Sequence, residues 1–231
     1  MDYVFQFREV LRYWPWLVEG TLVTVAISTV SMILCVILGT LGAVARRSRH
    51  RPLRWAIIGY VDLIRNTPFL VQLFILFFGL PSIGIRLDAM TAGILGIVLY
   101  NRAFTTEIIR AGLQAVHKSQ VESGLSIGMS RLQVFFYVVI LPAIEKVYPA
   151  LVSQFVLLML GTSIVSAIGV EELTSYAHQI QTLNFRSIEV YLVIICIYMG
   201  LTLTIRLGMR ALGLVLFASH RRRLRPAPAT R

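Results

Sequence analysis

A polar segment between two apolar runs holds the side chains best suited to grip another molecule. Residues 106–142 keep helical spacing but carry three glycines, Gly112, Gly124 and Gly128. The segment also holds charged and hydrogen-bonding side chains, which suit recognition of a partner rather than catalysis: Arg110, His117, Lys118, Gln120, Glu122, Ser126, Ser130 and Arg131. A loop that only joins two membrane spans needs no such segment. We therefore expect it to bind a soluble partner; the alternative is a merely solvated loop.

Helical spacing gives this segment two faces. Residues three or four positions apart share a face of an α-helix. Glu122 lies on the same helix face as Leu125 and Ser126, whereas Gly124 lies on the same face as Gly128. A face of small residues with an acidic edge can seat in a groove of a partner. We expect Gly128 to end the helix, since glycine is favoured just past a helix C-terminus, and a second short helix to follow.

A second polar group interrupts the second apolar run. Proline removes a backbone donor and usually kinks a helix, so Pro68 predicts a bent or broken helix there. A charge within the bilayer is costly and normally faces a partner or a water-filled cavity. Asp62 and Arg65 lie three residues apart, so they can pair on one helix face and hold the bend. Asn66 or Thr67 can cap the backbone groups that Pro68 frees.

Polar side chains inside the apolar runs also have a functional interpretation, because they can line a pathway for a solute. The competing interpretation is structural: an ion pair at the bend, and small hydroxyl residues as helix-packing positions. Both interpretations stay open for the pathway candidates: Arg65, Asn66, Thr67, Gln72, Asn101, Thr162 and Ser163.

The composition is that of a membrane protein. The 231 residues are 57% apolar and only 14% charged, whereas a soluble domain is about a quarter charged. The apolar residues form runs of about 20 or more, the length that crosses a bilayer core. We predict an all-α, polytopic fold with five spans, the second of them bent: residues 20–45, 53–80, 90–109, 147–168 and 188–212.

Shorter segments complete this organisation. Residues 1–17 are rich in aromatic side chains and are expected to lie as a short helix at the outer membrane interface. The apolar patch 134–141 is too short to span, so we place it at the interface and expect Pro142 to end it. The membrane domain then covers residues 18–215, and residues 216–231 form a basic cytoplasmic tail.

Arginine and lysine counts predict the orientation, because positively charged loops stay in the cytoplasm. Residues 46–54, 110–131 and 206–231 hold 15 of the 22 basic residues. The segments on the opposite side hold four: Arg8, Arg12, Arg86 and Arg186. Five spans then place the N-terminus outside and both the polar segment and the C-terminus in the cytoplasm. The net charge of +11 thus reflects topology and contact with anionic lipid rather than nucleic acid.

The sequence carries no motif for ATP binding or metal binding. The P-loop pattern G-x-x-x-x-G-K-[ST] is absent, as are a Cys/His cluster and a Ser/His/Asp set at one depth. Cys35 and Cys196 both lie in apolar runs, so we expect apolar fillers rather than a disulfide. We expect a membrane component with no enzymatic site, no metal and no cofactor of its own.

Residues 120–142, QVESGLSIGMSRLQVFFYVVILP, resemble the EAA loop of the membrane subunits of binding-protein-dependent ABC importers. In that loop E-A-A is followed after three residues by G, and later by L-P. Here Glu122, Ser123 and Gly124 match E-A-A, and Gly128 matches the glycine. Two departures are that Ser and Gly replace the alanines, and that the stretch from the glycine to L-P is one residue longer.

Further segments extend the resemblance. VHKSQ at 116–120 is similar to the I-P-K-G-Q of the polar amino acid branch, although His117 and Ser119 differ. RNTPFLVQLFILFFGLP at 65–81 resembles the R-G-T-P-L-L-V-Q stretch of that branch. The matches run in order over about residues 18–215.

The resemblance implies a type I permease fold and import of polar amino acids by alternating access across the bacterial inner membrane. It implies a second permease subunit, two cytoplasmic ATPases that bind ATP and Mg, and an external solute-binding protein. It assigns ATPase coupling to Gln120, Glu122, Ser123, Gly124 and Gly128. The alternatives are a type I permease for another small solute, an ATPase-independent channel or carrier, and a membrane protein that grips a soluble ATPase without transporting.

Overall fold

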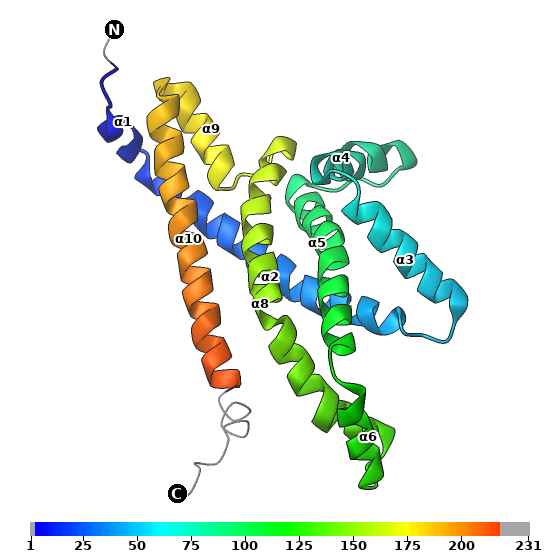
Figure 1. Ribbon diagram of the computed structural model, residues 1–231. Coiled ribbons are helices and arrows are strands. Elements are labelled where there is room, and N and C mark those ends of the chain that lie inside the picture. The colour runs from blue at the N-terminus through cyan, green and yellow to red at the C-terminus, as the bar shows by residue number, and fades with distance from the viewer. Residues whose placement is uncertain (1–2, 218–231) are drawn as a thin grey trace, which may run out of the picture.

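The computed structural model describes residues 3–217, apart from the side chain of Leu141. Within that range the chain is all-α and contains no strand, as predicted. Figure 1 shows a bundle of long helices, with α1 and α9 at one end and α6 at the other. The α-helices are α1 Phe7–Leu11, α2 Trp14–Ala45, α3 Arg51–Arg65, α4 Phe69–Phe74, α5 Ala89–Gln114, α6 Lys118–Ser126, α7 Arg131–Gln133, α8 Ile140–Gly161, α9 Leu173–Asn184 and α10 Ser187–Leu216.

Three helical stretches are long and apolar enough to cross a membrane: Trp14–Ala45, Pro142–Ile168 and Ser187–Leu216. The pair Arg51–Arg65 and Phe69–Ile83 makes a fourth if it is counted as one bent span. The remaining predicted span, residues 90–109, corresponds to α5, whose 26 residues reach about 39 Å at 1.5 Å per residue. The count of five therefore stays a prediction that depends on α5. The predicted basic tail lies, beyond Phe217, outside the described residues.

Glycines allow α2 and α5 to pack closely. A Cβ on Gly39 would lie 2.7 Å from Thr105 Cγ2, and one on Gly42 would lie 2.6 Å from Thr106 Oγ1. Small residues have this role in membrane helix packing, where van der Waals contact replaces the hydrophobic effect. Cys35 of α2 is buried against α5, and both cysteines are free, as expected.

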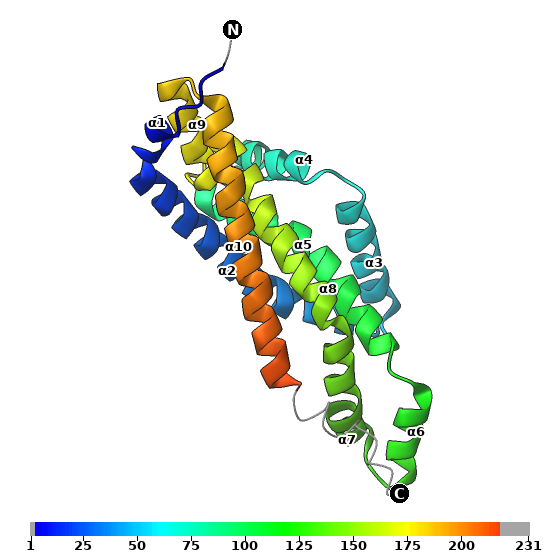
Figure 2. The ribbon, with the colours of Figure 1, turned by 60° about the vertical axis from the view of Figure 1, so that its left-hand side comes forward.

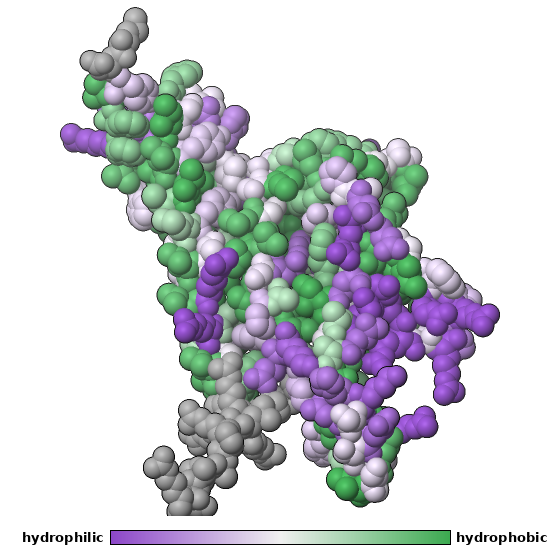
Figure 3. All heavy atoms as spheres, viewed as in Figure 1, coloured by the Kyte–Doolittle hydropathy of each residue, from purple (hydrophilic) through white to green (hydrophobic). Residues whose placement is uncertain are grey.

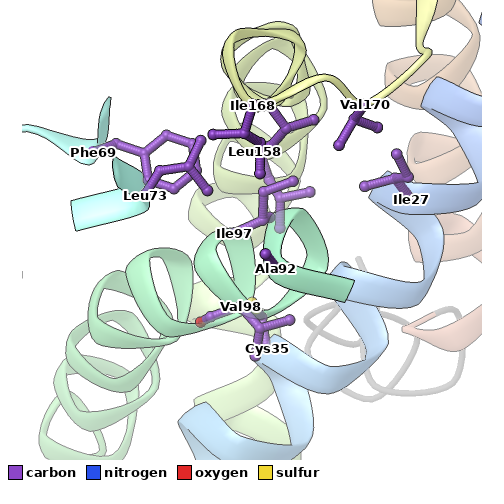
Figure 4. Close-up of a cluster of buried hydrophobic side chains, with 11 residues drawn as sticks. Ile27, Cys35, Phe69, Leu73, Ala92, Ile97, Val98, Leu158, Ile168 and Val170 are labelled. Carbon is purple, nitrogen blue, oxygen red and sulfur yellow. Dashed lines mark hydrogen bonds between the residues drawn. The ribbon is translucent and has the colours of Figure 1, made fainter. Parts of the chain in front are cut away.

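The apolar core joins α2, α4, α5 and α8. Figure 4 shows Phe69 and Leu73 of α4 pointing toward Leu158 and Ile168, and Cys35 beside Val98. This core anchors the short second half of the bent pair, while α3 lies outside the core and contacts α5 through Tyr60 and Arg65 (Figure 2).

The bend between α3 and α4 measures 110° and occurs where Pro68 predicts it. Thr67 Oγ1 donates to Leu63 O at 2.9 Å, so it caps α3 as expected. The proposed pair of Asp62 and Arg65 is wrong: no ion pair joins these two described residues. The Arg65 guanidinium instead lies 5.2 Å from the centroid of the Phe104 ring on α5.

Pro142 does not end a separate interfacial helix, which corrects the sequence prediction. A π-helical turn, Val134–Val139, runs directly into α8, and Pro142 lies in the first turn of α8. A proline ring clashes with the carbonyl four residues earlier in a regular α-helix. The widened π-helical turn relieves that clash, so the helix continues through residue 142.

Candidate functional site

The predicted coupling segment forms a compact elbow, defined here as residues 118–139. Helix α6 ends as expected before Gly128, which has a φ of 86°. Gly128 N donates to Leu125 O at 3.0 Å and Met129 N donates to Gly124 O at 3.2 Å. This pair of bonds is a Schellman motif, whose left-handed residue is usually glycine.

The second arm of the elbow begins with a capping box at Ser130. Ser130 Oγ accepts from Gln133 N at 3.3 Å, and Gln133 Oε1 accepts from Ser130 N at 2.8 Å. These reciprocal bonds satisfy two backbone donors at the start of the helix. The short helix α7 and the π-helical turn then lead into α8, so the elbow connects α5 to α8.

Gly124 faces inward rather than toward a partner. It is buried, and a Cβ there would lie 2.9 Å from Val134 Cγ2 in the second arm. The expected small-residue face therefore seats against the chain's own Val134. Gly124 sets the closeness of the two arms of the elbow.

The outward face of the elbow carries the other predicted coupling residues. Gln120, Glu122 and Ser123 are all exposed. Large apolar side chains are exposed beside them, at Ile127 (79%) and Leu132 (70%). An exposed apolar patch with a polar rim is typical of a protein-binding surface. The elbow also borders a cavity of about 600 Å³ lined by Glu122 and by residues of α5 and the second arm.

The base of the elbow is held to the bundle by charged and close-packed residues. Glu107 of α5 forms ion pairs with Arg46 of α2 and, at 2.8 Å, with Arg110. A Cβ on Gly112 would lie 2.1 Å from Val147 Cγ1, so α5 and α8 touch closely. The elbow is therefore attached to α2, α5 and α8 together.

The candidates at the bend hydrogen-bond within the bend itself. Gln72 Nε2 donates to Ile64 O at 2.9 Å and to Thr67 Oγ1 at 2.6 Å. Asn66 Nδ2 donates to Asp62 O at 2.7 Å. The bond to Ile64 O satisfies a carbonyl that Pro68, which has no N–H, leaves without an amide partner, whereas Asp62 O also accepts from Asn66 N at 3.2 Å. These bonds favour a structural role for Asn66, Thr67 and Gln72, while Arg65 stays exposed.

Of the remaining candidates, Asn101 lies in α5, and Thr162 and Ser163 begin the 3-10 helix Thr162–Ile168 that follows α8. Asn101 is buried, and its Oδ1 accepts from Gln154 Nε2 at 2.9 Å, which ties α5 to α8. Thr162 Oγ1 donates to Met159 O at 2.7 Å and Ser163 Oγ donates to Leu160 O at 2.8 Å. Each hydroxyl thus bonds a carbonyl in the last turn of α8. No hydrogen bond among residues 3–217 joins these residues to the candidates at the bend.

Two contacts in the membrane region involve residues outside the set of candidates chosen from sequence. Arg102 lies over the Tyr60 ring, 4.4 Å from its centroid, and Arg102 Nε donates to Tyr60 Oη at 2.8 Å. Gln154 was missed because a lone amide in an apolar run gives no hint of its partner. Arg102 itself stands out in the sequence as a charge toward the cytoplasmic end of the third predicted span, where it could snorkel to the headgroups or narrow the inner exit. The sequence did not predict its partner Tyr60.

At the opposite end of the molecule, Glu172 caps α9 from a fully buried position. Its Oε1 accepts from the amides of Thr174 at 2.8 Å and Ser175 at 3.0 Å. Its Oε2 accepts from Thr24 Oγ1 at 3.3 Å and Tyr198 Oη at 3.0 Å. One carboxylate therefore joins α2, α9 and α10. Across residues 3–217, no three His, Cys, Asp or Glu side chains gather as a metal site would require.

Known proteins are similar to this chain in both sequence and architecture. The family described as "Binding-protein-dependent transport system inner membrane component" matches residues 36–214. The chain is 38% identical to the L-cystine transport system permease protein TcyB of Bacillus subtilis, over 77% of this chain and 76% of that protein. It is 30% identical to the glutamine transport system permease protein GlnP of Escherichia coli, over 86% of this chain and 91% of that protein.

Solved structures extend the similarity to the fold. A chain of the crystal structure of an amino acid ABC transporter with histidines is 33% identical and has a TM-score of 0.86, covering 91% of this chain and 99% of that one. A chain of the MetNI methionine ABC transporter is 17% identical, covers 89% of this chain and 98% of that one, and shares the fold at a TM-score of 0.72. The chain therefore belongs to the binding-protein-dependent transport system inner membrane components, the permeases of ABC transporters, and is a membrane transport component rather than an enzyme.

Proposed function

We propose that this chain is the permease subunit of an importer for polar amino acids. Relatives at 30–38% identity are named for glutamine and L-cystine transport, and a structural neighbour at 33% identity comes from an amino acid ABC transporter. The membrane domain is residues 18–215, with residues 1–17 at the outer interface. The chain works with a second permease, two ATPases that bind ATP and Mg, and an extracytoplasmic solute-binding protein.

The observation that carries the mechanism is the elbow and its attachment. Gln120, Glu122 and Ser123 are exposed on α6, where an ATPase can hold them. Gly124 and Gly128 fix the shape of the elbow through the contact with Val134 and the left-handed turn. Closure of the ATPases then moves the elbow as a unit.

That motion reaches the membrane through the base of the elbow. Lys146 Nζ of α8 donates to Ala115 O just past the end of α5, and the buried bond between Asn101 and Gln154 joins the same helices further in. The cytoplasmic halves of α5 and α8 therefore move together when the elbow moves. Alternating access then follows from tilting these helices against the second permease, with Arg65, Asn101, Thr162 and Ser163 as the pathway candidates.

Co-purification of the ATPase from detergent tests this proposal. Glu122→Lys reverses the exposed charge on α6 and is expected to abolish ATPase association while membrane insertion is normal. Gly124→Leu is expected to do the same by forcing the arms of the elbow apart. The matched control Glu171→Lys makes the same change at an exposed residue near α9 and should retain the ATPase. Normal association of both elbow variants would contradict the proposal.

Uptake into proteoliposomes separates the rival functions. The importer requires ATP, the ATPases and the solute-binding protein for accumulation of a polar amino acid. Uptake by the chain without the ATPases would identify a channel or carrier. ATP-dependent uptake of a different solute would retain the permease and reject the substrate class.

A further inference from the structure

Helix α10 is only loosely covered by its own chain. Only 17% of its most apolar stretch of 18 residues is buried inside the described structure. In its C-terminal half the described contacts with α8 centre on Tyr148, whose Oη donates to Met209 O at 2.6 Å. The Tyr148 ring also fits against Gly213, where a Cβ would lie 2.8 Å from Cε1, and lies 5.3 Å from the Phe217 ring.

Two adjoining cavities lie between α8 and α10, and together they are called here the α8/α10 groove. The first, about 530 Å³, is lined mainly by apolar side chains, among them Leu160, Ile195 and Leu203. The second, about 410 Å³, is lined by apolar side chains together with Glu145, Ser153, Arg206 and Arg210. Arg206 lines both, so the groove changes from apolar to cationic along α10. In Figure 3 a hydrophilic patch interrupts the hydrophobic surface over the lower half of α10.

The contacts of α8 give the depth of this transition. Tyr148 meets Met209 of α10, while its neighbour Val147 meets Gly112 of α5. Arg210 is therefore at the level of Gly112, two residues beyond Arg110. At 1.5 Å per residue, Arg206 is about one turn further into the bilayer.

That level is the charged edge of the membrane domain. Glu107 pairs with Arg46 and Arg110 at the ends of α2 and α5, about two to three turns before the elbow begins. An arginine at this depth keeps its guanidinium among the lipid headgroups and lays its apolar stem along the helix. Arg206 and Arg210 thus reach headgroup depth, and the apolar cavity lies at acyl-chain depth.

The charges of the groove favour an anionic occupant. Neither Arg206 nor Arg210 forms an ion pair or side-chain hydrogen bond with any residue from 3 to 217. Glu145 supplies one carboxylate at the rim, so two guanidinium groups face one carboxylate. Basic pockets between membrane helices bind the headgroups of anionic lipids.

We propose that the α8/α10 groove binds an anionic phospholipid. Its phosphate lies between Arg206 and Arg210, and one acyl chain follows the apolar cavity past Leu203. The lipid supplies the packing that this chain does not give α10. This site is separate from the elbow, although Ser163, one of the pathway candidates, lines its apolar cavity. The proposal does not depend on which solute is transported.

Native mass spectrometry of the full-length chain, purified with its partner subunits, tests the proposal. The probes are dioleoylphosphatidylglycerol and dioleoylphosphatidylcholine, which share their acyl chains and differ in headgroup charge. The wild type should retain the anionic lipid in preference. Arg206→Gln and Arg210→Gln should each reduce that preference about fivefold, the contribution of one basic residue near a headgroup.

Control variants separate headgroup recognition from general damage. Arg51→Gln removes an exposed arginine outside the groove and should keep the preference. Arg206→Lys retains the charge and should also keep it. Leu203→Trp fills the apolar cavity and should reduce retention of both lipids without involving an arginine. Equal retention of the two lipids by the wild type, or an unchanged preference in both glutamine variants, would overturn the proposal.

A protein occupant is the remaining outcome to distinguish. Leu203→Cys in a Cys196→Ser background places one exposed thiol in the groove of the assembled transporter. Efficient disulfide formation between two permease subunits in native membranes would show that protein covers the groove, and this result would overturn the lipid site. A thiol that stays uncrosslinked agrees with lipid occupancy.

Discussion

At the scale of single residues, two glycines are needed for different physical reasons. A Cβ on Gly112 would lie 2.1 Å from Val147 Cγ1 and 3.0 Å from Ala143 O, so the absence of a side chain allows α5 and α8 to touch. Gly128 has open space around it but a φ of 86°, a conformation that glycine adopts without steric cost. The first glycine brings two helices together, and the second shapes the elbow.

Gly112→Ala should destabilise the chain by forcing α5 away from α8. We expect the free energy of unfolding to fall by about 1–3 kcal/mol, the usual cost of overpacking. Gly200→Ala is the matched control, because nothing lies within 4 Å of a Cβ at that helical glycine. It should leave stability unchanged or raise it slightly. Thermal unfolding in detergent measures both variants, and equal midpoints would refute the close approach.

Glu172 gives a prediction about pH. Burial raises the pKa of its carboxyl above the ordinary value near 4.5, although hydrogen bonds from Thr174, Ser175, Tyr198 and Thr24 oppose the shift. The folded chain then holds this proton more tightly than the unfolded chain. Stability therefore falls as pH rises from the unfolded pKa to the folded pKa, and stays at the lower level above it.

Glu172→Gln should remove this pH dependence and retain an acceptor for the amides of Thr174 and Ser175. Melting curves of the wild type and the variant between about pH 4 and 8 isolate the contribution, because other groups titrate in both. The wild type should lose stability relative to the variant as pH rises. Parallel curves over that range would show that the carboxyl keeps its ordinary pKa.

At the scale of elements, side chains rather than backbone amides hold the broken helix. The 110° bend leaves carbonyls at the end of α3, and Gln72 reaches back from α4 to Ile64 O and Thr67 Oγ1. Pro68 was enough to predict where the helix breaks. The partner of Gln72 could not be predicted, because a bond across a bend depends on the angle of the bend.

Gln72→Leu should loosen the connection between α3 and α4. Hydrogen bonds in membrane proteins contribute about 0.6–2 kcal/mol, so we expect a loss of that size in unfolding free energy. Asp62→Asn is the control, since the Asp62 side chain makes no hydrogen bond or ion pair with residues 3–217. Its stability should match the wild type. A larger loss for Asp62→Asn than for Gln72→Leu would restore the rejected ion pair as the brace.

At the scale of the whole molecule, the elbow and the segment around α9 lie at opposite ends of the helix bundle. Figure 1 shows α6 at one end of the bundle and α9 with α1 at the other. The excess of basic residues in 46–54 and 110–131 predicts that the α6 end is cytoplasmic. The buried carboxylates of Glu172 and Glu189 fasten the other end, where Glu189 accepts from Tyr3 Oη at 2.5 Å.

Cysteine labelling tests this orientation. Ser126→Cys on α6 and Thr182→Cys on α9 are both exposed positions, studied in a chain whose Cys35 and Cys196 are replaced by serine. A membrane-impermeant maleimide should label residue 126 only from the cytoplasmic side and residue 182 only from outside. Labelling of both from one side would contradict the topology. The reverse pattern would invert the orientation and remove the ATPase-binding role of the elbow.

The sequence by itself determined the all-α membrane class, the break at Pro68, the end of α6 at Gly128 and the family resemblance. Each of these depends on composition, on residues within a few positions of one another, or on short motifs that match in order along the chain, so no knowledge of helix pairing is needed. Only the tertiary structure decided that Gly124 packs against Val134, that Arg65 lies over Phe104, and that α8 continues through Pro142. The first two features depend on how separate segments approach one another, and in an apolar environment many pairings satisfy the same local pattern. The third depends on the π-helical turn before Pro142, which the sequence did not predict.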